Sequence, residues 1–401
     1  MRDVSLEAPL VAELARLDDE GLRRFRRVLA SPSAPRALVE GRQVLAFASN
    51  DYLGLAAHPD LSTALAEGAL AWGAGSGAAH LVSGHLRPHE ELEQALAAFT
   101  GFARCLTFST GYLANLAVTP TLAAGREDAI FADRLNHASL IDAARLSRAR
   151  QHRYPHCDMA ALARLLAESP AKTKVIVTDA VFSMDGDLAP LPELFRLAER
   201  FHAWLVVDDA HGFGVLGPQG RGSLAHTGVP AHPRVLLMGT LGKAAGISGA
   251  FVAGSELAIE YLLQKARSYI FTTAQPPAIA AALGKSLELV AAGDDRRAHL
   301  QALIQQLRAG CAGLPWRLLP SRTAIQALIV GDNNEALALS QALWQRGLWV
   351  AAIRPPTVPA GTARLRISLS AAHSRADVAE LIDALAAIHA KARTPEVFSD
   401  E

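Results

Sequence analysis

Short apolar runs that alternate with helical stretches constrain the fold of this chain more than any other feature of its sequence. A helical pattern from Leu191 to Ala203, which starts after Pro190, is typical of the segments between these runs. Strand–helix alternation of this kind predicts an α/β fold with a mainly parallel sheet. The runs that end in a polar residue or a glycine, and so indicate buried strands, are Val175–Asp179, Trp204–Asp208, Val235–Gly239 and Ala250–Gly254.

The character of the chain changes twice along its 401 residues, which predicts three parts. Residues 1–45 are polar and rich in arginine and predict a helical arm that ends in the break Ser31–Pro35. Residues 46–285 hold the alternating strands and helices and predict a large domain, and residues 286–401 predict a smaller α+β domain. Its expected elements are helices near 296–312 and 334–347, strands at Ile325–Val330, Trp349–Ile353 and Arg364–Ser368, and a last helix from about Ser374.

Charge and composition exclude several classes of function. The 39 basic and 39 acidic side chains cancel, so nothing in the net charge favours nucleic acid or an anionic membrane surface. No apolar stretch reaches the ~20 residues that a membrane-spanning helix needs. Cys105, Cys157 and Cys311 form neither a zinc spacing nor a disulfide framework. We therefore expect a cytoplasmic protein without a metal site.

Reactive side chains follow several predicted strands at the point where each strand ends. Asp208 closes one run, Lys243 follows another in Gly239–Lys243, and Ser183 follows a third. Gly111 and Tyr112 open a predicted helix after the run Leu106–Thr110. Because parallel α/β sheets bind ligands at the carboxyl ends of their strands, we expect these groups to share one site.

This set of side chains matches what pyridoxal 5′-phosphate (PLP) requires of a protein. The cofactor needs an amine for a Schiff base, an anion beside its pyridinium nitrogen, a phosphate cradle and a flat group against its ring. Lys243 can supply the amine and Asp208 the anion. Thr110–Tyr112, at a predicted helix N-terminus, and Thr240 can hold a phosphate. A histidine can cover the ring.

Each of these residues also has a plainer explanation when it is taken alone. Lys243 in a glycine-rich loop could be a solvated lysine. Asp208 and Asp209 could cap a loop or bind magnesium. His137 and His211 could be structural histidines. The prediction of a PLP site therefore depends on the joint order and spacing of the residues.

Other phosphate-binding and nucleophile motifs fail on their context. Gly73–Ala78 fits a dinucleotide-binding pattern but follows a helical stretch, Leu61–Trp72, instead of a strand. Gly242 and Lys243 are followed by Ala244, and no glycine stands at position 237, so there is no P-loop. The chain also lacks a G-x-S-x-G nucleophile elbow.

Four ordered motifs together resemble the α-oxoamine synthases over the stretch from about Asn50 to the last helix. The resemblance implies fold-type I PLP enzymes that condense an amino acid with an acyl thioester and release CO₂. The motifs are Ser49–Leu55, Asp208–Gly212, Thr240–Lys243 and Arg364–Ser368.

Two further segments, Ala352–Arg366 and Phe182–Asp187, are similar to one branch of this family. That branch joins L-alanine to a pimeloyl thioester in biotin biosynthesis. A sibling activity with glycine and a short acyl-CoA remains an alternative, as does a catalytically silent scaffold with the same fold. Whether the acyl carrier is coenzyme A or an acyl carrier protein is left open by the sequence.

The resemblance also implies roles for individual residues around the cofactor. Lys243 corresponds to the Schiff-base lysine and proton base, Asp208 to the partner of the pyridine nitrogen, and His211 to the donor to the ring hydroxyl. His137 corresponds to the histidine that stacks on the ring and contacts the substrate. The other cofactor-contacting positions are Gly111, Tyr112, Ser183 and Thr240.

The implied substrate contacts come from both ends of the chain. Arg354 would clamp the amino-acid carboxylate, as suits a planar guanidinium. Thr357 and Asn50 match positions near the substrate. Arg24 is the expected substrate arginine of the N-terminal arm, although Arg23 fits almost as well.

The resemblance finally implies a homodimer with active sites at the subunit interface. Phe271–Thr273 resembles a segment that reaches the phosphate bound by the neighbouring subunit. One departure from the family pattern is the glycine-rich stretch, which here is Gly75–Leu81 and includes His80.

Overall fold

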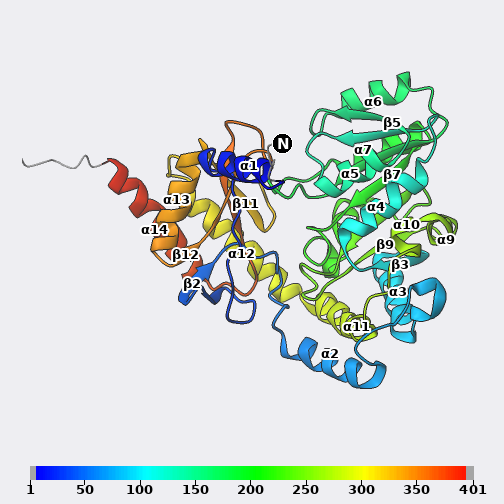
Figure 1. Ribbon diagram of the computed structural model, residues 1–401, viewed down its shortest axis with the longest axis horizontal. Coiled ribbons are helices and arrows are strands. Elements are labelled where there is room, and N and C mark those ends of the chain that lie inside the picture. Colours follow the sequence, from blue (N-terminus) through cyan, green and yellow to red (C-terminus); the bar gives the residue numbers. More distant parts are fainter. Residues whose placement is uncertain (1–5, 394–401) are drawn as a thin grey trace, which may run out of the picture. The chain divides into compact units, whose positions relative to one another are not determined.

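The computed structural model describes residues 6–393 and divides into two compact units. The larger unit comprises Asn50–Ser183 and Asp187–Leu300. The smaller unit comprises the described residues before Asn50, the short segment Met184–Gly186 and the described residues after Leu300. Figure 1 labels many of the elements of both units.

In the described residues of the larger unit, one seven-stranded sheet has the order β3-β9-β8-β7-β6-β4-β5. β4, β5, β6, β7 and β8 run parallel to their neighbours in the sheet, whereas β9 runs antiparallel to both β8 and β3. The prediction of an α/β fold with a mainly parallel sheet is therefore confirmed. The strands are β3 (Arg104–Phe108), β4 (Ala129–Asp133), β5 (Arg150–Tyr154), β6 (Lys174–Asp179), β7 (Trp204–Asp208), β8 (Val235–Thr240) and β9 (Ala250–Gly254).

Both faces of this sheet are buried, which explains why its strands are continuous apolar runs. Ile130 and Phe131 are neighbours on β4, but they belong to separate core clusters, as do Leu205 and Val206 on β7. Successive side chains of a strand point to opposite faces, so an apolar run supplies both clusters. The helices of this unit are α2 (Pro59–Trp72), α3 (Arg87–Thr100), α4 (Gly111–Leu122), α5 (Ala138–Leu146), α6 (Met159–Glu168), α7 (Leu191–Arg200), α8 (Ser223–Thr227), α9 (Glu256–Lys265), α10 (Arg267–Ile270) and α11 (Pro277–Ala292).

The smaller unit contains two small sheets, of orders β1-β2-β12 and β10-β11-β14-β13. The predicted strands at 325–330 and 364–368 and the predicted helices near 296–312, 334–347 and from 374 are confirmed within two residues at each end, apart from the open end of the last helix. Its elements are α1 (Ala8–Asp19), β1 (Arg36–Val39), β2 (Arg42–Ala46), β10 (Arg317–Leu318), β11 (Ile325–Gly331), α13 (Asn333–Gln345), β12 (Leu348–Trp349), β13 (Ala351–Ile353), β14 (Ala363–Ser368) and α14 (Arg375–Arg393). Helix α12 (Asp294–Cys311) begins in the larger unit and ends in the smaller one.

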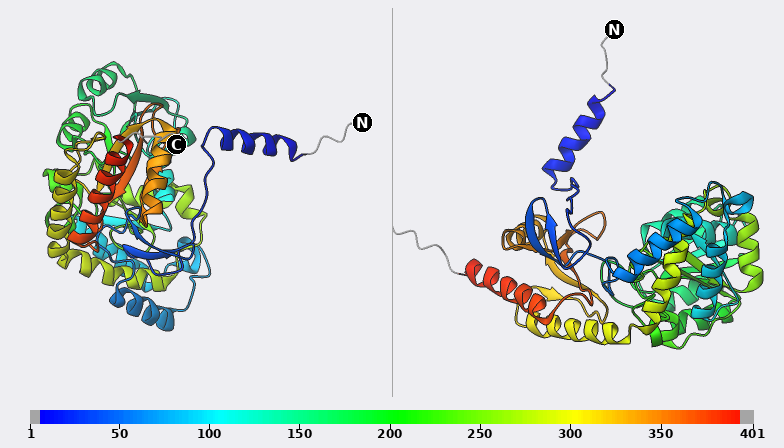
Figure 2. Two further views of the ribbon diagram at one scale, coloured as in Figure 1. Left: turned by 90° about the vertical axis from the view of Figure 1, so that its left-hand side faces the viewer. Right: turned by 90° about the horizontal axis from the view of Figure 1, so that it is seen from below.

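The expected helical arm is wrong beyond Asp19. Strands β1 and β2 form an antiparallel hairpin whose turn, Glu40–Gly41, has φ angles of 50° and 77°. Two consecutive residues with positive φ favour the tight turns that match the twist of a hairpin. Helix α1 itself has no buried residue, and Figure 2 shows it as a blue helix that stands away from the sheets of its unit.

Two other predicted elements are shorter than expected. The helix predicted over 191–203 ends at Arg200, because His202 has a left-handed φ of 52° that a helix does not tolerate. The strand predicted over 349–353 is two strands. β12 pairs with β2, whereas β13 pairs with β14 in the other sheet. An apolar run does not reveal that its two halves bond to different partners.

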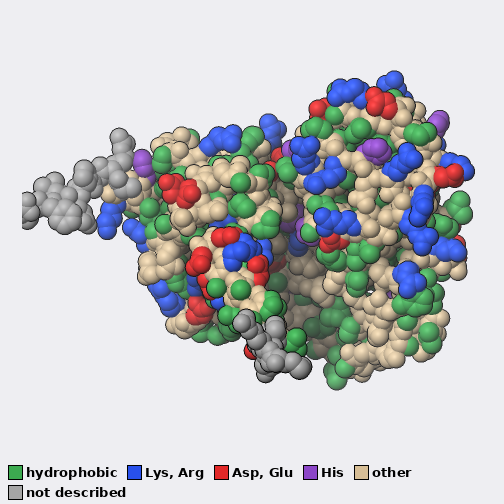
Figure 3. Space-filling view, turned by 45° about the horizontal axis from the view of Figure 1, so that its top comes forward, with side chains coloured by type: hydrophobic (Ala, Val, Ile, Leu, Met, Phe, Trp, Pro, Cys, Tyr) green, Lys and Arg blue, Asp and Glu red, His purple; other side chains and the backbone are tan. Residues whose placement is uncertain are grey.

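The surface carries charges of both signs. On the face drawn in Figure 3, basic and acidic side chains are scattered among apolar and polar ones instead of forming one block, which agrees with a net charge of zero. Within residues 6–393, no helix has both the length and the apolar composition that crossing a membrane requires.

Candidate active site

The loop after β8 presents Lys243 on a tight turn. Gly246 N donates to Lys243 O at 2.9 Å, and Gly246 has a φ of +75°. A Cβ atom at this position would lie 2.7 Å from the backbone carbon of Leu55. Only glycine therefore allows the Lys243 loop to pack against the Asn50–Leu55 segment at this distance.

A chain of hydrogen bonds connects Lys243 to two other predicted site residues. Lys243 Nζ lies 2.9 Å from His211 Nε2, and His211 Nδ1 lies 2.6 Å from the hydroxyl of Tyr52. The Tyr52 hydroxyl donates to Asn50 Oδ1 at 3.1 Å. Since Tyr52 donates to Asn50, its oxygen accepts the His211 Nδ1 proton, which leaves Nε2 to accept a hydrogen bond from Lys243 Nζ. The structure thus brings Lys243, His211 and Asn50 together.

Tyr52 is a site residue that sequence reasoning missed. Its side chain is only 1% exposed, and it orients His211 from the side opposite Lys243. The available signal was its position inside the Ser49–Leu55 motif, but the motif does not say which side chain of the distant Asp208–Gly212 segment it meets.

Asp208 ends β7 as a buried carboxylate that is fixed through both oxygens. Its Oδ1 accepts from Ala210 N at 3.0 Å, and its Oδ2 accepts from Asn115 Nδ2 at 2.7 Å. Asn115 lies on α4 and also donates to Ser139 Oγ at 2.8 Å. Asp208 is 3% exposed and forms no salt bridge among the described residues. A buried carboxylate without a cationic partner is costly, so this group is prepared to receive a positive charge.

His137 caps the N-terminus of α5 at the same end of the sheet. Its backbone N donates to Asp179 Oδ2 at 2.7 Å, and its Nδ1 accepts from Ser139 N at 3.2 Å. Burial lowers the pKa of His137, and the nearby Lys243 charge lowers it further, against the opposing effect of Asp208. The ring is therefore neutral near pH 7, and since Nδ1 accepts, Nε2 carries its proton.

Asp179 is a second site residue that sequence reasoning missed. It pairs with Asp208 in the register of β6 and β7, so two carboxyl groups end neighbouring strands. Burial raises the pKa of Asp179, and the Asp208 charge raises it further. Of the two groups, Asp179 is the one driven toward its neutral form.

The predicted phosphate-binding residues lie at the N-terminus of α4 and at the end of β8. Thr110 caps α4 by accepting from Leu113 N at 3.2 Å, and Gly111 and Tyr112 form the first turn. The first N–H groups of a helix have no partner within it and favour anions. The Tyr112 hydroxyl donates to Asp142, and the Thr240 hydroxyl donates to Gly249 O at 3.2 Å. Ser183 is half-buried in the loop after β6.

Arg24, Arg354 and Thr357 belong to the smaller unit, where they line one cavity of about 540 Å³. The Nε atom of Arg354 is buried and has no hydrogen-bond partner among the described residues. Burial lowers the pKa of Arg354, and the neighbouring Arg24 charge adds to this effect. Arg23 lines the same cavity but already pairs with Asp18 at 2.5 Å. The cavity therefore offers positive charge and an unused donor, which suit a carboxylate.

The donor chemistry of the larger unit fits PLP. Lys243 offers an amine, Asp208 offers a buried carboxylate that lacks a salt bridge within residues 6–393, and the α4 N-terminus offers backbone N–H groups. These are the groups that hold and tune this cofactor.

Comparison with known proteins places these observations in a family context. The family model described as aminotransferase class I and II matches residues 42–385. An 8-amino-7-oxononanoate synthase from Dechloromonas aromatica is 70% identical, over 95% of this chain and 99% of the relative.

Two solved structures show the same fold. An 8-amino-7-oxononanoate synthase from Francisella tularensis matches with a TM-score of 0.75 and 32% identity, over 88% of this chain and 99% of that one. A serine palmitoyltransferase from S. paucimobilis, solved with PLP and myriocin bound, matches with a TM-score of 0.89 and 31% identity, over 96% and 98% of the two chains.

Proposed function

Because the chain belongs to the 8-amino-7-oxononanoate synthases within the class I and II aminotransferase family, we propose that it condenses L-alanine with a pimeloyl thioester. The products are 8-amino-7-oxononanoate, CO₂ and the free thiol carrier. The observation that best supports this proposal is the Lys243–His211–Tyr52 chain beside the buried, fixed carboxylate of Asp208. Lys243 follows β8 and Asp208 ends the neighbouring β7, so an amine and a carboxylate lie at the same end of the sheet.

PLP is the cofactor that we assign to this site. Lys243, Asp208, His211 and His137 would hold it, and its phosphate would lie at the α4 N-terminus. Once bound, PLP supplies an electron sink for negative charge that develops at the amino-acid Cα.

The chain's own residues would perform proton transfer and orientation. Lys243 Nζ takes the proton from the alanine Cα as general base, and His211 Nε2, which accepts from Nζ, keeps the amine in position. A bond then forms between Cα and the acyl carbon, while the bond from that carbon to sulfur breaks and the thiol leaves. The bond from Cα to the carboxylate breaks to give CO₂, and Lys243 returns its proton to Cα. The leaving thiolate takes one proton from solvent to become the free thiol, so the balance needs only the two substrates and this proton.

Arg354 of the smaller unit would bind the alanine carboxylate. We expect Arg354→Ala to lower kcat/KM for alanine by on the order of 100-fold, since a charge-assisted hydrogen bond contributes roughly 1.5–3 kcal/mol. Arg354→Lys keeps the charge but loses the two-point contact and should still lose on the order of 10-fold. Steady-state kinetics with alanine varied at saturating thioester measure both effects.

Arg23 and Arg24 provide a matched pair of variants for the same assay. Arg24→Ala should raise KM for one of the two substrates. Arg23→Ala should change both KM values little, because Arg23 already forms an ion pair with Asp18. An effect of Arg23→Ala equal to that of Arg24→Ala would reverse the assignment of the arm's substrate arginine.

The choice of substrates is tested by a comparison of two amino acids and several acyl donors. We expect alanine with a pimeloyl thioester to give the highest kcat/KM. Highest turnover with glycine and acetyl-CoA or succinyl-CoA would instead identify a sibling synthase. Pimeloyl-CoA and pimeloyl acyl carrier protein, compared in the same assay, identify the carrier.

We also propose that the protein works in the cytoplasm as a homodimer. Phe271, in the segment predicted to reach a neighbouring subunit, is 69% exposed, and Thr273 bridges to Ala79. Light scattering should give twice the 42.5 kDa mass of one chain.

A further inference from the structure

We propose that His156 is a positioning residue that ties together the two turns carrying His137 and Ser183, by binding Asp133 with one ring nitrogen and Asp187 with the other. The proposal rests on the proposed function in so far as it takes His137 and Ser183 to be cofactor contacts. Nothing in the sequence patterns pointed to His156.

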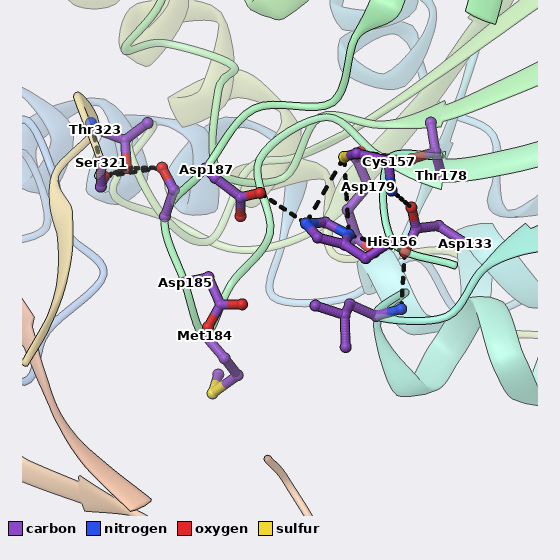
Figure 4. Close-up of polar contacts among 12 residues, drawn as sticks. Asp133, His156, Cys157, Thr178, Asp179, Met184, Asp185, Asp187, Ser321 and Thr323 are labelled. Atoms are coloured by element: carbon purple, nitrogen blue, oxygen red, sulfur yellow. Dashed lines mark hydrogen bonds and ion pairs between the residues drawn. The ribbon is translucent and has the colours of Figure 1, made fainter. Parts of the chain in front are cut away.

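The ring of His156 lies between two carboxylates in the larger unit. It follows β5, and its Nδ1 lies 3.0 Å from Asp133 Oδ1 while its Nε2 lies 2.7 Å from Asp187 Oδ2. Figure 4 shows the ring between the two carboxylates, with dashed lines to its partners. The edge of the ring meets Phe182 at a centroid distance of 4.4 Å, so the ring has little room to rotate.

Asp133 shapes the turn that ends in His137. It is the last residue of β4, its side chain is 1% exposed, and its Oδ1 also accepts from Leu135 N at 2.8 Å. Its Oδ2 accepts from Cys157 N at 2.8 Å, which fixes His156 to it through the backbone as well. The conformation of this turn decides where His137 begins α5.

Asp187 shapes the loop that carries Ser183. The loop is closed by a bridge between Val181 and Leu188, and Phe182 N donates to Asp187 O at 3.0 Å. Its tip, Met184–Gly186, belongs to the smaller unit. Asp187 Oδ1 is buried and has no hydrogen-bond partner among the described residues. The carboxylate therefore depends on His156 for compensation of its charge.

Both contacts together require a protonated ring. A neutral imidazole has one N–H and one lone pair, so it can donate to only one of two carboxylates. Burial opposes the charge, but the hydrogen bonds to Asp133 and Asp187 outweigh it and raise the pKa of His156 to about 12. The geometry of the bridge therefore favours the charged form of the ring.

The strand order explains why such a bridge affects the site. β4 and β6 are neighbours in the sheet, and the turns that follow them hold His137 and Ser183. The first turn already bonds to the end of β6 through His137 N and Asp179, and His156 adds a second link that reaches the Ser183 loop itself. Loss of the bridge should therefore weaken cofactor binding in addition to lowering the stability of the fold.

The decisive variant is His156→Gln in the full-length holoenzyme. A glutamine amide can donate to one carboxylate while its carbonyl oxygen faces the other. We expect the dissociation constant of PLP to rise by about 10-fold, within the range measured for couplings between contacting residues. PLP retained after equilibrium dialysis against graded PLP concentrations measures it without reference to any substrate.

A double variant separates positioning from general loss of stability. Asp187→Asn in the His156→Gln background replaces the uncompensated carboxylate with an amide that can pair with Gln, so PLP affinity should recover to within about 3-fold of wild type. His152→Gln is the matched control, because His152 lies on the adjacent β5 and stacks on Phe131 instead of a carboxylate. It should leave PLP affinity unchanged.

Two results would overturn the proposal. One is His156→Gln with wild-type PLP affinity and only a lower melting temperature, which would make His156 merely structural. The other is a double variant that binds PLP no better than His156→Gln. If His156→Gln does not fold, Asp187→Asn alone must still weaken PLP binding. If the variants change PLP affinity as expected but the wild-type protein does not turn over alanine and thioester, the proposed function fails and this inference stands.

Discussion

Replacing Lys243 with alanine should lower kcat/KM by on the order of 10⁴-fold or more, because the variant loses both the covalent attachment of the cofactor and the proton base. The fold should survive, since the half-buried Lys243 side chain lies on a loop and contributes nothing to the core clusters. The variant should also lose the visible absorbance of the lysine-bound cofactor. Steady-state kinetics and the absorbance spectrum of the purified protein measure the two effects.

Lys172→Ala is the matched control for this variant. Lys172 is 74% exposed and pairs with Glu127 on the surface, where ion pairs contribute little. Near wild-type turnover by Lys243→Ala would remove the basis of the proposed chemistry, whatever the control shows.

Asp208→Asn should bind PLP but lose activity by on the order of 10²–10³-fold, the scale of loss when one electrostatic contact of an active site is removed. Asparagine can keep the contacts with Ala210 N and Asn115 only in part, and it carries no charge to stabilise a protonated cofactor ring. The effect should fall on kcat more than on cofactor retention. Kinetics at saturating PLP, together with the PLP content of the protein, separate the two.

Asp295→Asn serves as the comparison for Asp208→Asn, since Asp295 is exposed in the first turn of α12. An Asp208→Asn protein as active as this control would show that no charge is needed beside the cofactor ring. It would leave the buried carboxylate of Asp208 without a function.

The large sheet was predictable because each of its central strands is buried on both faces. Trp204–Asp208 and Ala250–Gly254 have the same bounds in the sequence prediction and in the structure. The antiparallel direction of β9 was not predictable, since an apolar run has the same composition in either direction. The hairpin at residues 36–46 was missed because its strands are short and lie in a segment rich in basic residues, where the alternation of apolar and polar side chains is hard to recognise.

The candidate site shows the same division between local and long-range information. Lys243, Asp208, His211 and His137 are identified by ordered motifs, and the roles proposed for them stay predictions until variants are measured. Tyr52, Asp179 and His156 could not be identified, because the role of each depends on contact with a residue far away in the sequence. Such pairings follow from the strand order, which no single motif contains.

The most direct test of the account is to supply the holoenzyme with a pimeloyl thioester and L-alanine labelled with ¹³C in its carboxyl group. We predict that labelled CO₂ and unlabelled 8-amino-7-oxononanoate form in equal amounts, both identified by mass spectrometry. The label in the amino-ketone product, or no product from alanine while glycine is consumed, would contradict the account.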